Sequence, residues 1–276
     1  MLPSASGGGG PLDRHVFIDQ DMAEGQVLQV EGRAAWVYSA RCPGVEGPNQ
    51  DAAGVVSGRG RAALVVADGM GGQAGGESAS RIALTSLCDR ASEAVSADED
   101  LRGPILDSIE EANRKIMALG IGAATTLAAV ELKGDELRAY HVGDSAILVV
   151  GQRGKLKLRT IAHSPVGYAL EAGLLDEKHA MQHEERHLVS NMVGSTDMRI
   201  EVGSPIRLAP RDTVVLGSDG LFDNLSLREI VDDIRTGPVE QGGAALAAHC
   251  RKRMATTSSV APSKPDDCTF IVLRGH

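Results

Sequence analysis

Aspartates follow or precede short apolar runs at five points of this chain, and carboxylates in such positions could bind cations. Asp68 comes directly after the run 62–67, and Asp219 lies just beyond the run 213–216. Unpaired carboxylates at the ends of buried strands are unfavourable by several kcal/mol each. Few cationic residues lie near these acidic motifs in the sequence. Hard divalent cations prefer oxygen ligands. The five acidic motifs are Asn49-Gln50-Asp51, Asp68-Gly69-Met70-Gly71-Gly72, Gly143-Asp144-Ser145, Ser218-Asp219-Gly220 and Asp266-Asp267.

A simpler explanation covers each motif taken singly. Asp-Gly pairs are ordinary turn residues, and they occur here at Asp68-Gly69 and Asp219-Gly220. Five such motifs together are harder to explain as turns alone. The spacing does not show that the carboxylates meet in space, so both explanations stay open from the residues alone.

Composition narrows the class of protein. The net charge is −9, and no Lys/Arg run offers the basic face that a nucleic-acid binder needs. No apolar run is long enough to cross a bilayer, and the beginning of the chain lacks the pattern of a signal peptide. The 4 cysteines form no CxxC pair, which argues against a zinc site. Scattered, apolar-flanked cysteines are typical of reduced core residues, so we expect a cytoplasmic protein.

Hydrophobic periodicity predicts a mixed α+β fold with antiparallel sheets, because runs of strands and runs of helices do not alternate strictly. The hydrophobic fraction is 42% but aromatics make up only 3%, so we expect an aliphatic core. Strands are expected over 34–39, 62–67, 127–132, 137–142, 146–150, 156–161, 213–216 and 269–273, and helices over 77–95, 105–119, 169–186, 229–234 and 244–254. Residues 1–30 are expected to be a partly disordered N-terminal extension, in which 27–30 could begin a strand.

Six motifs in one order resemble the metal-dependent protein phosphatases, the PPM family of type 2C, in their bacterial form. The motifs are GPNQDA (Gly47–Ala52), VVADGMGGQAGGESAS (Val65–Ser80), GAATTLAAV (Gly122–Val130), HVGDSAILVV (His141–Val150), LGSDGLFDNLS (Leu216–Ser226) and DDCTFIV (Asp266–Val272). The resemblance implies a four-layer α-β-β-α sandwich, with two antiparallel sheets flanked by helix pairs. It also implies a single domain over 31–276, with a variable flap at about 164–194.

The resemblance also assigns roles to the aspartates. It implies two Mn²⁺ or Mg²⁺ ions, with a third held more weakly, and catalysis through Asp51, Asp68 and Asp219. The implied metal ligands are Asp51, Asp68, Gly69 through its carbonyl, Asp144, Asp219 and Asp266. Two such ions lower the pKa of a bridging water towards about 7, and the resulting hydroxide attacks phosphorus. Asp266 is preferred over Asp267, because the family often has Asn at the second position.

Three residues depart from the better-known members. Met70 stands where many members have a proton-donating histidine, and Met cannot donate a proton. Gln50 replaces a frequent Glu. Glu46 stands where relatives often carry a basic residue that binds the substrate phosphate, so Arg41 is a candidate for that role, with a surface arginine as the alternative.

Histidines offer a second, weaker set of candidates. The histidines and glutamates of 183–187 are expected to form a solvated helix face rather than a metal site. His141 is expected to be a core or edge residue of its strand, and His163 is a weak candidate for a proton relay.

The leading hypothesis is therefore a metal-dependent phosphatase that hydrolyses phosphoserine and phosphothreonine in proteins, opposing a bacterial-type Ser/Thr kinase, and monomeric. Two alternatives remain. Glu46 favours a pseudophosphatase that acts as a binding or regulatory module. A phosphatase for a small metabolite is the other, and the flap sequence favours neither substrate class.

Overall fold

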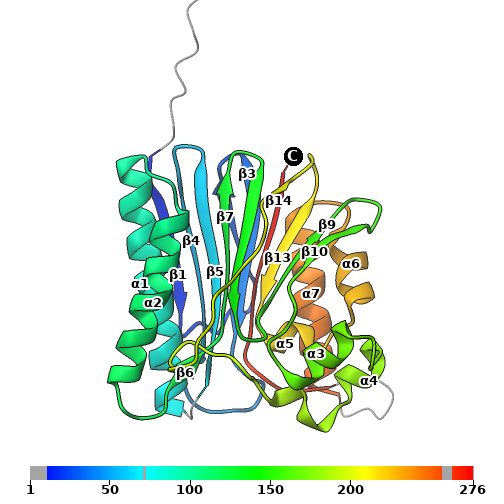
Figure 1. Ribbon diagram of the computed structural model, residues 1–276. Helices are drawn as coiled ribbons and strands as arrows, with labels where there is room; N and C mark the ends of the chain where they lie inside the picture. The colour runs from blue at the N-terminus through cyan, green and yellow to red at the C-terminus, as the bar shows by residue number, and fades with distance from the viewer. Residues whose placement is uncertain (1–10, 71–72, 257–262, 276) are drawn as a thin grey trace, which may run out of the picture.

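Two antiparallel sheets pack face to face at the centre of the molecule, and helices cover the outer face of each sheet (Figure 1). The computed structural model describes residues 11–70, 73–256 and 263–275. This arrangement confirms the α+β sandwich expected from the sequence. The helices α1 and α2 lie on one side, and α6 and α7 lie on the other.

The two sheets are named A and B. Sheet A has the order β1-β4-β5-β7-β8-β11, with β12 paired to β8 and β6 paired to β5. Its strands are β1 (Asp13–Ile18), β4 (Asp51–Gly58), β5 (Arg61–Met70), β6 (Ala124–Thr125), β7 (Leu127–Lys133), β8 (Glu136–Val142), β11 (Glu201–Val202) and β12 (Ile206–Arg207). Sheet B has the order β10-β9-β13-β14-β3-β2. Its strands are β2 (Gln26–Val30), β3 (Arg33–Ala40), β9 (Ala146–Val150), β10 (Leu156–Arg159), β13 (Thr213–Gly217) and β14 (Cys268–Gly275).

The helices fall into an outer pair, a flap group and a C-terminal group. The outer pair is α1 (Gln73–Ala97) and α2 (Arg102–Ala118); the flap group is α3 (Pro165–Glu171), α4 (Glu177–Met181) and the 3-10 helix η1 (Glu184–His187); the C-terminal group is α5 (Asp219–Phe222), α6 (Leu227–Ile234) and α7 (Val239–Met254). In Figure 1 the flap group lies near α5, at one end of the sandwich. None of the described helices is both long and apolar enough to span a membrane.

Three apolar layers hold the sandwich together: one lies between the sheets, one beneath the outer pair of helices and one beneath the C-terminal group. Strand β4 shows how the period of 2 produces them. Ala53 and Val55 point into the layer between the sheets, whereas Ala52 and Val56 point into the layer beneath α1 and α2. Each central strand is therefore buried on both faces, and polar side chains concentrate at the strand ends.

The structure differs from the sequence expectations at the N-terminal segment and in β4. Strand β1 pairs with β4 in sheet A, and β2 pairs with β3 in sheet B. The sandwich therefore includes strands that precede the expected domain start at residue 31, and residues 1–10 of the expected extension lie outside the described part. Strand β4 was not expected, because its sequence DAAGVVSG is rich in Ala and Gly, which are depleted in strands.

The expected long helix over 169–186 is broken into three short ones. Helix α3 ends at Glu171, and Gly173 follows with φ of 70°. Glycine adopts this left-handed conformation without a Cβ penalty and commonly terminates helices. Asp176 then caps α4 by accepting a hydrogen bond from the His179 backbone N–H at 2.9 Å. The charge-rich composition of this segment predicts one helix, whereas its local capping residues divide it into three.

Candidate metal centre

Two aspartates of sheet A lie directly opposite each other. Asp51 begins β4 and Asp68 lies near the end of β5, and the two are register partners in the antiparallel pair. Asp51 is 1% exposed, and its carboxylate accepts a hydrogen bond from the Ser218 hydroxyl at 2.7 Å. Like charges directly opposite each other destabilise a sheet. We call Asp51 and Asp68 the sheet-A carboxylates.

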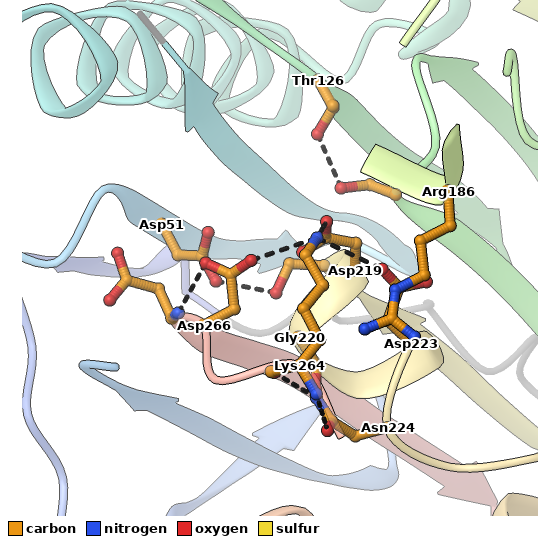
Figure 2. A network of polar contacts seen from close by, with 12 residues as sticks. Asp51, Thr126, Arg186, Asp219, Gly220, Asp223, Asn224, Lys264 and Asp266 are labelled. Carbon is orange, nitrogen blue, oxygen red and sulfur yellow. Dashed lines mark hydrogen bonds and ion pairs between the residues drawn. The ribbon is translucent and has the colours of Figure 1, made fainter. Parts of the chain in front are cut away.

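Three further aspartates gather beyond the ends of two sheet-B strands, and we call them the sheet-B carboxylates. They are Asp219, Asp223 and Asp266. Lys264 lies among them (Figure 2): its Nζ contacts Asp219 and lies 3.1 Å from Asp266 Oδ2 and 3.2 Å from Asp223 Oδ2. Asp223 and Lys264 are not among the site residues predicted from the sequence. A glycine is required beside Asp219, because a Cβ on Gly220 would lie 1.9 Å from the Asp267 carbonyl oxygen.

The two groups of carboxylates and Asp144 influence one another, and together we call them the acidic cluster. Burial is the largest cause that raises the pKa of Asp51 and of Asp68 well above 3.8; repulsion from Asp267 then acts on Asp51, and repulsion from Asp51 acts on Asp68. Burial, followed by repulsion from Asp219, raises the pKa of Asp144 to about 8. The same two causes raise the pKa of Asp223 and of Asp266 to about 6.

The donor set of the acidic cluster fits divalent cations. Six carboxylates repel one another across this end of the sandwich, and the single ammonium of Lys264 offsets part of that charge. One oxygen of Asp223, Oδ2, is buried without a hydrogen bond, although it lies 3.2 Å from Lys264 Nζ. Carboxylate oxygens are the preferred ligands of Mg²⁺ and Mn²⁺. The cluster is therefore chemically suited to more positive charge than these side chains supply.

Gly69 and its neighbours bring the sheet-A carboxylates close to the loop before β4. The Gly69 backbone N–H donates to the Gln50 carbonyl oxygen at 3.1 Å. The Asp68 carbonyl oxygen accepts from the Thr126 backbone N–H at 2.9 Å and from the Thr125 hydroxyl at 2.8 Å. These contacts hold the backbone at Asp68 and Gly69, near the end of β5, in one conformation.

Asp267 and Arg41 make contacts that set them apart from the acidic cluster. The carboxylate of Asp267 accepts backbone hydrogen bonds from Cys42 at 2.8 Å and from Gln50 at 2.7 Å, so it fastens the loop before β4 to β14. Arg41 donates to the Gly47 carbonyl oxygen at 2.9 Å and pairs with Asp21 at 3.2 Å. Its side chain is 39% exposed.

A cavity of about 170 Å³ lies between the flap group and the acidic cluster. Asp144, Asp219 and Asp223 line one side, and residues of α3, α4 and η1 line the other. Arg186 lies at this cavity and donates to the Met181 and Ser263 carbonyl oxygens, so it ties the flap to the segment that carries Lys264. Figure 2 shows Arg186 near Asp223. A molecule that enters this cavity meets both apolar surface and carboxylates.

His141, His163 and Glu201 form the one set of three potential ligands in the described residues whose ligand atoms all lie within 4.8 Å. Both ring nitrogens of His163 and Nε2 of His141 already have hydrogen-bond partners within the protein. His163 Nδ1 accepts from the Gly143 backbone N–H at 3.1 Å, so its Nε2 carries the proton that Glu201 accepts at 3.1 Å. His141 Nε2 donates to the Ile161 carbonyl oxygen at 3.0 Å. We interpret the set as a hydrogen-bonded support beneath the flap.

Comparison with known proteins gives one consistent result. Residues 42–260 match the family model described as protein phosphatase 2C. A protein phosphatase 2C-type relative from Streptococcus pyogenes is 33% identical over 178 residues, which cover 61% of this chain and 70% of the relative. The S. agalactiae serine/threonine phosphatase superposes with a TM-score of 0.74 at 27% identity, over 88% of this chain and 99% of that one. The catalytic domain of the serine/threonine protein phosphatase PstP, solved with 2 manganese ions, has a TM-score of 0.69 at 25% identity, over 87% and 96% of the two chains.

Proposed function

The chain belongs to the protein phosphatase 2C family and is a metal-dependent protein serine/threonine phosphatase, and we propose that the acidic cluster is its catalytic metal centre. The observation that supports this assignment most strongly is the convergence of the sheet-A and sheet-B carboxylates at one end of the sandwich, where Asp219 and Asp266 repel Asp68 and the Ser218 hydroxyl beside Asp219 donates to Asp51. Phosphorylated proteins are its substrate class. The manganese ions of the PstP structure support Mn²⁺ as the first metal to test, with Mg²⁺ as the second.

We assign the metal ligands as follows. Asp68 and the Gly69 carbonyl would hold one ion, and Asp68, Asp219 and Asp266 would hold a second. Asp144 would hold the third, more weakly bound ion, and Asp223 lines the same cavity as Asp144. When bound, such ions lower the pKa of water and offset the charge of the phosphoryl oxygens.

Asp51 is assigned to orient the attacking water. The Ser218 hydroxyl donates to Asp51 Oδ2 at 2.7 Å and accepts from the Thr269 backbone N–H at 3.1 Å. This pair of hydrogen bonds fixes the carboxylate in one rotamer, because both partners are buried. Its second oxygen can then accept a hydrogen bond from water. Orientation of this kind needs no reorganisation during the reaction.

Arg41 remains our proposal for a group that contacts the substrate phosphate, although Gly47 and Asp21 hold its guanidinium in the present conformation. A bacterial-type Ser/Thr kinase as the opposing enzyme, a monomeric state and a cytoplasmic location are likewise proposed. The relatives favour catalysis over a pseudophosphatase, and the phosphoprotein phosphatases among them favour peptides over small metabolites.

Hydrolysis of p-nitrophenyl phosphate and of phosphothreonine peptides tests the assignment. Turnover should require Mn²⁺ and stop with EDTA. Asp68→Asn and Asp219→Asn should each reduce kcat by more than about 100-fold, because even outer partners of metal ligands contribute 10–100-fold. Asp135→Asn, in the β7–β8 turn, is the matched control and should keep full activity. Activity retained by both cluster variants contradicts the assignment, and a metabolite hydrolysed faster than any phosphopeptide contradicts the substrate class.

A further inference from the structure

Lys264 occupies a built position inside the candidate metal centre. Its Nζ contacts the Oδ2 atoms of Asp219, Asp223 and Asp266, and its side chain is 19% exposed. The buried Asn224 holds its backbone in both directions: the Lys264 N–H donates to Asn224 Oδ1 at 2.9 Å, and the Lys264 carbonyl oxygen accepts from Asn224 Nδ2 at 2.9 Å. Figure 2 shows the ammonium directed at the carboxylates.

Two of these three carboxylates, Asp219 and Asp266, are the ones that we assign to the second metal ion. The ammonium therefore contacts the same side chains that a divalent ion would ligate. Both cations cannot keep those contacts together without strong mutual repulsion at a few ångströms. Lysine has a flexible four-carbon stem, so its ammonium can move away while Asn224 keeps the backbone in place.

We propose that Lys264 is an internal cation that competes with the second divalent ion for Asp219 and Asp266 and thereby sets the affinity of that site. The inference rests on the proposed function, since it takes those two residues as ligands. Without metal, the ammonium reduces the repulsion among the sheet-B carboxylates. With metal, it leaves them. Removal of the ammonium should therefore tighten metal binding and weaken the metal-free protein.

The main test compares Mn²⁺ binding by isothermal titration calorimetry at pH 7, after chelator treatment. Lys264→Met keeps the stem length and removes the charge. Coupling between two binding events typically changes affinity about 5- to 150-fold. We therefore expect the Kd of Lys264→Met for Mn²⁺ to be lower than that of the wild type by a factor in this range, or Lys264→Met to bind an additional ion that the wild type excludes. Lys264→Arg keeps the charge and should stay close to the wild type.

Lys157→Met is the matched control. Lys157 pairs with Asp212, whose side chain is 4% exposed. Asp212 directly precedes the first residue of β13, whereas Asp219 follows the last, so the two carboxylates lie at opposite ends of this strand. This variant also removes a lysine from a buried carboxylate, but it should leave the Kd for Mn²⁺ unchanged. In EDTA, both Met variants should melt below the wild type, and Mn²⁺ should raise the Tm of Lys264→Met by more than it raises that of Lys157→Met.

A measurement on the wild-type chain covers the case in which Lys264→Met fails to fold. In protein labelled with ¹³C-lysine, the Lys264 Cε resonance, identified by its absence from Lys264→Arg, should shift when Mg²⁺ is added. An unchanged resonance at saturating Mg²⁺, or a Kd for Lys264→Met equal to or higher than that of the wild type, contradicts the proposed competition but leaves the metal assignment intact. If no variant and no wild-type sample binds Mn²⁺, the metal assignment falls with it.

Discussion

The two sides of the acidic cluster carry the same kind of charge but balance it differently. The sheet-A carboxylates face each other across a β-ladder, and the hydroxyl of Ser218 donates a hydrogen bond to the Asp51 carboxylate. The sheet-B carboxylates share the ammonium of Lys264. A neutral hydroxyl can orient a carboxylate, but it does not cancel its charge.

This difference means that a bound cation gains a different amount of free energy on each side of the acidic cluster. The sheet-A side stores repulsion that a bound cation can relieve, which favours tight binding there. The sheet-B side is already partly neutralised, so a cation gains less by entering it. We therefore expect the metal-free protein to be destabilised mainly by the sheet-A carboxylates.

The largest expected effect is on the free energy of unfolding, which should change in opposite directions when a carboxylate is removed from the sheet-A side and from the sheet-B side. In EDTA, Asp68→Asn should raise the free energy of unfolding by about 1–3 kcal/mol, because it removes a partly buried charge that forms no ion pair within the described residues. Asp219→Asn should lower it by a similar amount, because Lys264 loses its nearest partner. Urea denaturation of both, with Asp135→Asn as the control, checks the signs. A decrease of equal size in both variants contradicts the comparison.

The pH dependence of the metal-free protein is expected to be next in size. Burial first, and then repulsion, raises the pKa of Asp51 and Asp68 well above 3.8 and that of Asp144 to about 8. A carboxyl whose pKa is raised by folding favours the native state below its unfolded pKa, and this contribution is lost as pH rises through the folded value. Stability in EDTA should therefore fall by a few kcal/mol between about pH 4 and pH 8.

Excess Mn²⁺ should remove or reverse that trend, since bound ions require ionised carboxylates. Lys264 does not contribute to it: nearby carboxylates raise its pKa above 10.5 despite burial, so it stays charged throughout this range. Thermal melts at several pH values, with and without Mn²⁺, make the comparison. A metal-free protein that becomes more stable from pH 4 to pH 8 contradicts the expectation.

The fold was predictable where hydrophobic pattern and turn residues agreed. Strands such as β5 and β13 are short apolar runs that end in Asp-Gly or Gly-Ser-Asp, and the structure has both. In α2, Ile105, Ile109 and Ile116 share the buried face as the spacing indicated. Strand β4 was missed because burial on both faces replaces alternation with small residues, and β1 was missed because its strand is half exposed.

The site was predictable only in part, for a physical reason. Aspartates at strand ends carry a local signal, because burial makes an unpaired charge unfavourable wherever it lies. Lys264 lies in a polar, proline-bearing segment without periodicity, and Asp223 follows a single helical turn. Their roles depend on contacts between segments some 40 residues apart, such as the hydrogen bonds between Lys264 and Asn224. No local pattern encodes such contacts.

Arg41 offers the smallest expected effect and tests whether a basic side chain outside the acidic cluster binds the substrate phosphate. Its ion pair with Asp21 is partly exposed, and exposed pairs contribute about 0–1 kcal/mol. Arg41→Ala should therefore change stability by less than about 1 kcal/mol. If the guanidinium also contacts the substrate phosphate, KM for p-nitrophenyl phosphate should rise about 2- to 5-fold with kcat unchanged.

The matched control is Arg33→Ala, which removes a comparable pair with Asp135 at the β7–β8 turn and should leave KM unaltered. The rise in KM should also shrink as salt increases, because screening weakens exposed charge interactions. A KM identical to that of the wild type at low salt removes Arg41 from substrate binding.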